Sequence, residues 1–303
     1  MYHTTVGRCA PGLANLVFHI FEEDFTMTSF RDLTLRSGLV AAIIIAAVLT
    51  CTATTFGQEQ PAQETTTAKL GQIQKRTYDF KAAGKEMEYA LFVPSSYKKD
   101  KATPLMVALH GLHSNPHQII RYPGLTQLAE KHGYIVVAPM GYNSRGWYGS
   151  RGQTSPRNTP ENLGELSEKD VMNVLEIVRG EFNVDPNRIY LMGHSMGGGG
   201  TWHLGLKYPK LWAALAPIAP AIYRSTDALE TIKHIPVIVV QGAKDPLVKA
   251  DNTRRWVAKM KELEMDHTYI EDPDGGHVMV AFENLPKIFE FCNLRKKKPK
   301  PAE

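Results

Sequence analysis

Short runs of consecutive apolar residues recur along the chain, and each is about as long as a strand buried in a sheet. They span residues 104–109, 134–138, 189–192, 212–217 and 235–240. Runs without polar alternation are typical of strands that are covered on both faces, as in parallel sheets. Residues 78–94 alternate more and turn at 83–84, which predicts two edge strands, and residues 267–270 predict a last strand.

Segments with helical periodicity separate these runs, at residues 119–131, 167–182, 253–265 and 278–293. Buried strands that alternate with helices at this spacing predict an α/β fold, with a mostly parallel, doubly wound sheet of about eight strands flanked by helices. The connection 221–234 is too short to hold a large lid domain. The polar stretch 139–164 is too long for a passive connector, so it predicts a functional loop.

The apolar run 189–192 leads into Gly193-His194-Ser195-Met196-Gly197, and a helical segment follows. A serine between two glycines at a strand-to-helix corner is the pattern of a nucleophile elbow. There the serine backbone is strained so that its hydroxyl projects above the sheet edge, and the residues two before and two after have no room for a Cβ. The same pattern occurs by chance in Gly-rich loops, so Ser195 is a candidate nucleophile whose role depends on partners elsewhere.

A serine hydroxyl is a poor nucleophile near neutral pH unless a base takes its proton and a carboxylate orients that base. Asp245 is the candidate acid, because it follows a buried run by a few residues, at the carboxyl end where such sheets place their sites. His277 is the candidate base, in a loop between two glycines and the last helix. The order serine, acid, histidine therefore predicts a triad of Ser195, Asp245 and His277.

Other residues compete for these roles. The candidate acid alone is also explained as a turn or helix-capping residue. Asp272 and Asp274 are alternative acids, but they lie too close to His277 in sequence for the usual placement. His194 neighbours the serine, yet its side chain is expected to point away from the hydroxyl.

Acyl transfer also needs two backbone N–H groups that stabilise a developing oxyanion. Met196 is predicted to supply one, from the position after the nucleophile, and Leu112 the other, from the loop after the first buried strand. His113, Trp147 and Tyr148 are candidates to line a substrate pocket, where the two aromatic rings could stack on an aromatic or sugar ring. Aromatic residues on loops are as often packing anchors.

Composition and charge narrow the function classes. The chain has 303 residues, 43% hydrophobic and 22% charged, which is typical of one globular domain, placed here at 71–294. The tail 295–303 accounts for the net charge of +4 and is predicted to be a disordered basic end. No basic stripe or motif indicates a nucleic-acid partner, and no ligand spacing indicates a metal or another cofactor.

The first part of the chain, residues 1–57, is predicted to be a targeting segment. Two arginines precede an uncharged run over 37–57 with an apolar centre, and small residues follow. This pattern describes a secretory signal peptide, with Met27 as the more natural start and 58–70 as a linker. We expect a secreted or periplasmic protein. The alternative is a retained membrane anchor through 37–57, because the run approaches ~20 residues.

The chain resembles the serine esterases of the α/β-hydrolase superfamily at Leu-His-Gly (109–111), residues 185–198, Gly-Ala-Lys-Asp-Pro (242–246) and Gly-Gly-His (275–277). Within that superfamily it resembles polyhydroxyalkanoate-depolymerase-like and feruloyl-esterase-like carboxylesterases, over about residues 78–292. The resemblance implies hydrolysis of small-molecule or polymer esters through an acyl-enzyme, without a cofactor. The alternatives are a prolyl-oligopeptidase-like serine peptidase and a catalytically inactive hydrolase-fold binding protein.

Overall fold

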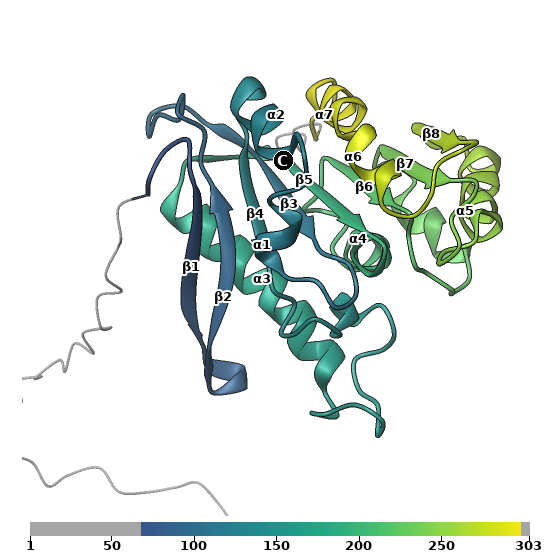
Figure 1. Cartoon of the computed structure of the whole chain (residues 1–303), viewed down its shortest axis with the longest axis horizontal. Coiled ribbons are helices and arrows are strands. Elements are labelled where there is room, and N and C mark those ends of the chain that lie inside the picture. Colours follow the sequence, from purple (N-terminus) through teal and green to yellow (C-terminus); the bar gives the residue numbers. More distant parts are fainter. Residues whose placement is uncertain (1–67, 298–303) are drawn as a thin grey trace, which may run out of the picture. The chain divides into compact units, whose positions relative to one another are not determined.

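The structure of this protein is a computed structural model that describes residues 68–297 (Figure 1). The predicted leader or anchor at 1–57 and most of the predicted linker at 58–70 lie outside the described residues. Within residues 68–297, no helix combines the length and the apolar composition that a membrane crossing requires.

Eight strands form one sheet in the order β1-β2-β4-β3-β5-β6-β7-β8. The β1–β2 hairpin is antiparallel, β2 runs antiparallel to β4, and all the other pairs are parallel. This confirms the predicted α/β fold with a mostly parallel sheet. The strands are β1 (Ile73–Phe80), β2 (Lys85–Phe92), β3 (Thr103–Leu109), β4 (Ile135–Pro139), β5 (Val184–His194), β6 (Ala214–Ile218), β7 (Val237–Gly242) and β8 (His267–Asp272).

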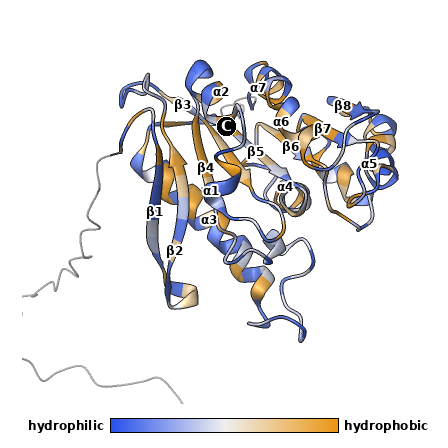
Figure 2. Ribbon diagram, in the orientation of Figure 1, coloured by the Kyte–Doolittle hydropathy of each residue, from blue (hydrophilic) through white to orange (hydrophobic). Residues whose placement is uncertain are grey.

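Alternate residues of the central strands pack against opposite layers of helices. In β3, Leu105 and Val107 belong to one core, whereas Met106 and Ala108 belong to the other. Where both faces are covered, the central strands are mainly apolar, while the edge strand β1 is largely hydrophilic (Figure 2). The first face is covered by α3 (Leu163–Glu181), α4 (Met196–Lys207) and α5 (Ala250–Glu262), and the second by α1 (Pro116–Ile119), α2 (Leu125–His132), α6 (Met279–Glu283) and α7 (Leu285–Asn293).

The prediction of one helix over residues 119–131 is wrong. The structure has α1 and α2 there, with a break between them. Pro123 has no N–H to continue a helix, and Gly124 adopts a φ of 92°, in the left-handed region that favours glycine. The break leaves Tyr122 between the two helices, where its hydroxyl reaches His194 at the end of β5.

The C-terminal tail begins later than predicted. Arg295 donates two hydrogen bonds, of 3.0 and 2.8 Å, to the carboxylate of Asp266. The N–H of Lys297 donates to the carbonyl of Asn187 at 2.9 Å. The prediction of disorder from residue 295 onward is therefore wrong for its first three residues, and residues 298–303 lie outside the described part of the chain.

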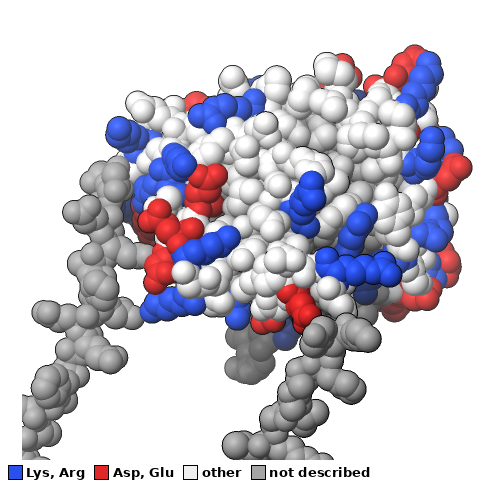
Figure 3. Space-filling view, turned by 60° about the horizontal axis from the view of Figure 1, so that its bottom comes forward, with Lys and Arg blue, Asp and Glu red and all other residues white. Residues whose placement is uncertain are grey.

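Charged side chains are distributed unevenly on the face shown in Figure 3. Lysine, arginine, aspartate and glutamate gather on the left, toward the β1–β2 hairpin, and on the right, toward α5, with a broad area of few charges between them. The connection from β6 to β7 holds the short 3-10 helix η3 (Asp227–Ile232), and it is too short for a large lid domain, as predicted. The other 3-10 helices are η1 (Lys81–Ala83) and η2 (Trp147–Gly149).

Candidate active site

Ser195 occupies the corner between β5 and α4. Its backbone has a φ of 60° and a ψ of −115°, a conformation that residues with a side chain rarely adopt. Its N–H donates to Ile218 at 2.9 Å, and its carbonyl accepts from Gly199 at 3.1 Å and from Ala221 at 3.0 Å. Ser195 is partly exposed although residues 191–194 and 196–200 are buried. The surrounding backbone therefore holds a strained serine at the surface of an otherwise buried segment.

Gly193 and Gly197 flank this corner for a steric reason. A Cβ on Gly193 would overlap the carbonyl of Gly197, and a Cβ on Gly197 would overlap the carbonyl of Leu109 in β3. Strand β3 and helix α4 thus touch through backbone atoms. This is the close approach expected two residues before and two residues after a nucleophile elbow.

Asp245 and His277 meet beyond the carboxyl ends of β7 and β8. The Oδ2 atom of Asp245 lies 2.7 Å from Nδ1 of His277 and accepts a bond of 3.3 Å from Gln241. Its Oδ1 atom accepts the N–H groups of Leu247 at 2.8 Å and Val248 at 2.9 Å. Four donors thus fix a carboxylate whose side chain is fully buried. Because a carboxylate only accepts, Nδ1 of His277 carries a hydrogen and Nε2 is free to take a proton.

The imidazole of His277 lies beside the elbow. Nε2 of His194, the residue before Ser195, is 2.8 Å from the His277 carbonyl, and the two rings are 4.8 Å apart at their centres. Within residues 68–297, no hydrogen bond joins the Ser195 hydroxyl to the His277 ring. Such a bond is commonly looser before substrate binds. The three predicted triad residues share one rim of the sheet, and their catalytic roles stay predictions.

The loop after β3 runs alongside the elbow, because a Cβ built on Gly111 would lie 3.5 Å from the Cβ of the candidate nucleophile. In this loop the N–H of His113 donates to Ser144 at 2.9 Å, whereas the described residues offer no acceptor to the N–H of Leu112. Met196 is the first residue of α4, so its N–H has no partner within the helix. Two amides are thus available beside the serine, and their role as an oxyanion hole stays a prediction.

One predicted pocket residue, Tyr148, lies in the core instead. It is 0% exposed, its ring packs against Gly200 of α4, and its hydroxyl donates to a backbone carbonyl at 3.2 Å. The prediction that Tyr148 lines a substrate pocket is wrong, because its ring fills space left by a glycine. Trp147 is partly exposed, with the guanidinium of Arg151 stacked 3.4 Å from its ring centre, and His113 is exposed. For these two residues the pocket role stays a prediction.

Two buried acids of α3, which were not predicted from the sequence, anchor the 139–164 loop and α4. Asp170 accepts the N–H of Gly141 at 2.6 Å and the hydroxyl of Tyr78 at 2.5 Å, and burial raises the pKa of Asp170. The other acid is Glu168, which accepts bonds from Gln153 at 3.0 Å and His203 at 2.8 Å.

Glu168 also pairs with Lys207 at 2.6 Å and accepts from Tyr208 at 2.5 Å. Burial opposes its ionisation, but bonds from His203, Lys207 and Tyr208 outweigh burial and lower the pKa of Glu168 to about 2. A sequence signal for both acids existed. Residues 168 and 170 fall on the apolar face of the predicted helix, where an acid needs a partner.

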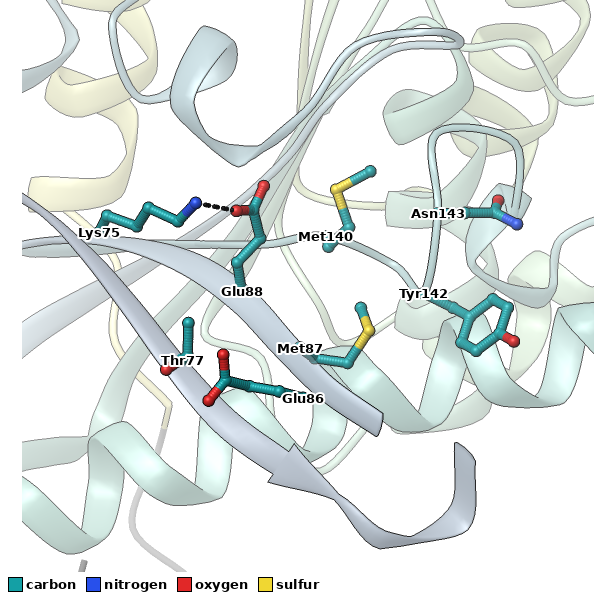
Figure 4. Close-up of a pocket in the computed structure, with 8 residues that line it drawn as sticks. All are labelled: Lys75, Thr77, Glu86, Met87, Glu88, Met140, Tyr142 and Asn143. Atoms are coloured by element: carbon teal, nitrogen blue, oxygen red, sulfur yellow. Dashed lines mark ion pairs between the residues drawn. The ribbon is translucent and has the colours of Figure 1, made fainter. Parts of the chain in front are cut away.

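A cavity of about 430 Å³ lies between the β1–β2 hairpin and the loop after β4 (Figure 4). Lys75 and Glu88 form an ion pair of 2.7 Å on its hairpin side, and Met140 and Asn143 line the side of the loop. The carbonyl of Met140, one of the lining residues, lies 2.8 Å from Nε2 of His110, the residue before Gly111. Sequence reasoning missed it because its two walls come from segments 50 residues and more apart.

The sequence pattern of the esterase family matches residues 81–283, about two thirds of the chain. The chain belongs to the esterase family. The matched segment contains the elbow at Ser195, the acid Asp245 and the base His277. This membership and the sheet order together identify an α/β-hydrolase fold of the serine-esterase type.

Individual relatives agree with this membership. The chain is 27% identical over 181 residues to a bifunctional acetylxylan esterase/xylanase of Neocallimastix patriciarum, a match that covers 59% of this chain and 24% of that protein. It is 30% identical over 147 residues to the S-formylglutathione hydrolase of Rattus norvegicus, covering 45% of this chain and 52% of the relative. The chain thus spans about half or less of the length of these relatives. The crystal structure of a thermostable esterase matches with a TM-score of 0.57 at 26% identity, over 74% of this chain and 63% of that one.

Proposed function

We propose that this protein hydrolyses carboxylic esters through an acyl-enzyme. Ser195 attacks the ester carbonyl carbon while Nε2 of His277 takes the hydroxyl proton and then gives it to the leaving alcohol. Asp245 keeps the hydrogen of His277 on Nδ1, and the amides of Leu112 and Met196 stabilise the oxyanion. A water molecule, deprotonated by the same imidazole, then releases the acid and frees the serine.

The hydrogen-bonded pair of Asp245 and His277 carries this proposal. Its Nδ1–Oδ2 distance is 2.7 Å, the carboxylate is fully buried, and the imidazole is 10% exposed. A buried pair that leaves one imidazole nitrogen free, beside a serine in a strained conformation, is typical of a catalytic site. Membership of the esterase family supports an ester as the substrate.

The substrate that the surface favours is a small-molecule or polymer ester with an apolar acyl or alcohol group. Four apolar side chains, each at or within two residues of a candidate site residue, are 41–69% exposed: Leu112, Leu247, Val278 and Met279. Exposed apolar side chains next to candidate site residues are consistent with a binding surface. The similarity to an acetylxylan esterase supports a polymer as a substrate class. We expect p-nitrophenyl butyrate to be cleaved up to about 15-fold more efficiently than the acetate, since two further methylenes contribute about 1.6 kcal/mol if fully buried.

Turnover of p-nitrophenyl acetate tests the chemistry. Ser195→Ala should lower kcat by at least about 10³-fold. The matched control is Ser225→Ala, which changes an exposed serine on the loop after β6 and should leave kcat unchanged. Equal turnover in Ser195→Ala and the unchanged chain would reject the assignment. Preferential cleavage of proline or alanine amides would favour a peptidase, and failure to react with a fluorophosphonate probe would favour an inactive binding protein.

We also propose that the protein is exported through its N-terminal segment and is secreted or periplasmic. The support is the sequence alone: a basic flank, an uncharged run over 37–57 and small residues after it. Sequencing the N-terminus of the protein from the culture medium or the periplasm should find a start after this run. A chain that keeps residues 37–57 in the membrane fraction would instead be anchored.

A further inference from the structure

His194 directly precedes Ser195 and makes two hydrogen bonds that the mechanism above does not use. Its Nδ1 lies 2.8 Å from the hydroxyl of Tyr122, and its Nε2 lies 2.8 Å from the main-chain carbonyl of His277. The residue is 4% exposed. We propose that His194 is a positioning residue, which holds the main chain of His277 in register with the nucleophile. This inference rests on the proposed function.

The partners of His194 determine which of its nitrogens carries the hydrogen. A carbonyl oxygen can only accept, so Nε2 donates to His277. Burial and the neighbouring His277 ring lower the pKa of His194 to about 4, so the ring is neutral near pH 7 and Nδ1 is an acceptor. Burial raises the pKa of Tyr122 to about 12, so its hydroxyl keeps its proton and donates to Nδ1. One chain of hydrogen bonds thus runs from Tyr122 through His194 to His277.

This chain supplies an anchor that Asp245 does not. Asp245 fixes the imidazole of His277 through Nδ1, from the loop after β7. His194 fixes the main chain of the same residue from the end of β5, the strand that carries the nucleophile. The two anchors come from different strands, so together they set the position of the His277 ring relative to the elbow.

Tyr122 itself packs against α6, the helix that follows His277. Its ring packs edge-on against Phe282 of α6, with the ring centres 4.8 Å apart. The ring of His194 also lies 4.8 Å from that of His277, at an angle of 37°. A neutral ring in this place adds no positive charge beside His277 when that imidazole takes up a proton. A displacement of about 1 Å in a catalytic group can lower a rate by about 10²-fold, so the loss of this anchor should be visible in kcat.

Two amide substitutions separate the anchor from simple packing. The terminal amide of glutamine in His194→Gln reaches the place of Nε2, so it can still donate to the His277 carbonyl. The shorter amide of asparagine in His194→Asn reaches the place of Nδ1 and keeps only the contact with Tyr122. The third variant, His194→Leu, keeps volume and removes both bonds.

We expect His194→Gln to keep kcat for p-nitrophenyl acetate within about fivefold of the unchanged chain. His194→Asn and His194→Leu should lose about 10- to 100-fold in kcat with little change in KM, because the reacting groups and not the substrate are displaced. Ser195→Ala is the reference. Loss of turnover in Ser195→Ala with equal losses in the Gln and Asn variants would overturn this inference alone. Full turnover in Ser195→Ala would overturn the proposed function as well.

A measurement on the unchanged chain keeps the inference testable if a variant does not fold. Nitrogen NMR spectra of the unchanged protein labelled with ¹⁵N and ¹³C report which ring nitrogen carries hydrogen, and through-bond correlations from the ring to the main chain assign the signal to His194. A neutral His194 ring with its hydrogen on Nε2 between pH 6 and 8 supports the inference. A ring with its hydrogen on Nδ1, or a charged ring, would overturn it.

Discussion

Asp245→Asn changes one group of the predicted triad with almost no change in volume, and the structure determines the consequence. Oδ1 accepts two backbone N–H groups, from Leu247 and Val248, whereas Oδ2 faces Nδ1 of His277. The amide oxygen must take the place of Oδ1, because an NH₂ group there would face two other donors. The NH₂ group then faces His277, whose Nδ1 can only accept from it. The hydrogen of the imidazole moves to Nε2, which can no longer take a proton from Ser195.

We therefore expect kcat for p-nitrophenyl acetate to fall by about 10⁴-fold at pH 7, as the equivalent change does in another serine hydrolase, with little change in KM. This corresponds to about 5.5 kcal/mol of barrier. The matched control is Asp274→Asn, on the turn before His277, whose side chain is 82% exposed and pairs with Lys244; its kcat should stay within about twofold. Thermal unfolding shows whether the variants fold. A folded Asp245→Asn that loses less than tenfold would refute the predicted tautomer and with it the role of this acid.

Further variants test the framework of the site. Gly197→Ala should destabilise the fold by about 3 kcal/mol or more in urea unfolding, because its Cβ overlaps the Leu109 carbonyl. The control is Gly180→Ala in α3, whose Cβ meets nothing within 4 Å, so this variant should be neutral or stabilising. Similar results for both variants would contradict the packing at the elbow. Tyr148→Ala should lose about 4 kcal/mol of stability, as substitution of a core aromatic does. A rise in KM at unchanged stability would instead show that Tyr148 lines the substrate pocket. Glu168→Gln should cost about 2 kcal/mol above pH 4.5. Since the folded-state pKa of Glu168 lies below its unfolded value, this stabilisation is lost as the pH falls toward 2, and a difference that stays the same from pH 6 to pH 3 would contradict the charged contacts.

The sheet and the order of the predicted triad could be derived from the sequence because both depend on local patterns. A strand covered on both faces is mainly apolar, as residues 105–109 of β3 and 237–240 of β7 are, so it can be recognised without any knowledge of its neighbours. The nucleophile elbow needs glycines for steric reasons, so Gly193 and Gly197 mark it directly. Asp245 and His277 stand out since each closely follows a predicted strand near the end where the sheet places its site.

The features that sequence reasoning missed depend on contacts between distant segments. Tyr122 and His194 are 72 residues apart, and only the break between α1 and α2 brings the hydroxyl to the imidazole. Tyr148 was predicted to line a substrate pocket because it lies in a long polar loop, yet Gly200 of α4 leaves the space that buries its ring. The same holds for the tail, since Arg295 pairs with Asp266, which lies 29 residues earlier in the sequence.

Mass spectrometry of the protein after reaction with a fluorophosphonate tests the central claim, that Ser195 is activated as a nucleophile, most directly. The account predicts one adduct per chain, on the peptide that contains Ser195, and no adduct in Ser195→Ala. An adduct on another residue, or ester turnover by a chain that leaves Ser195 unlabelled, would contradict it.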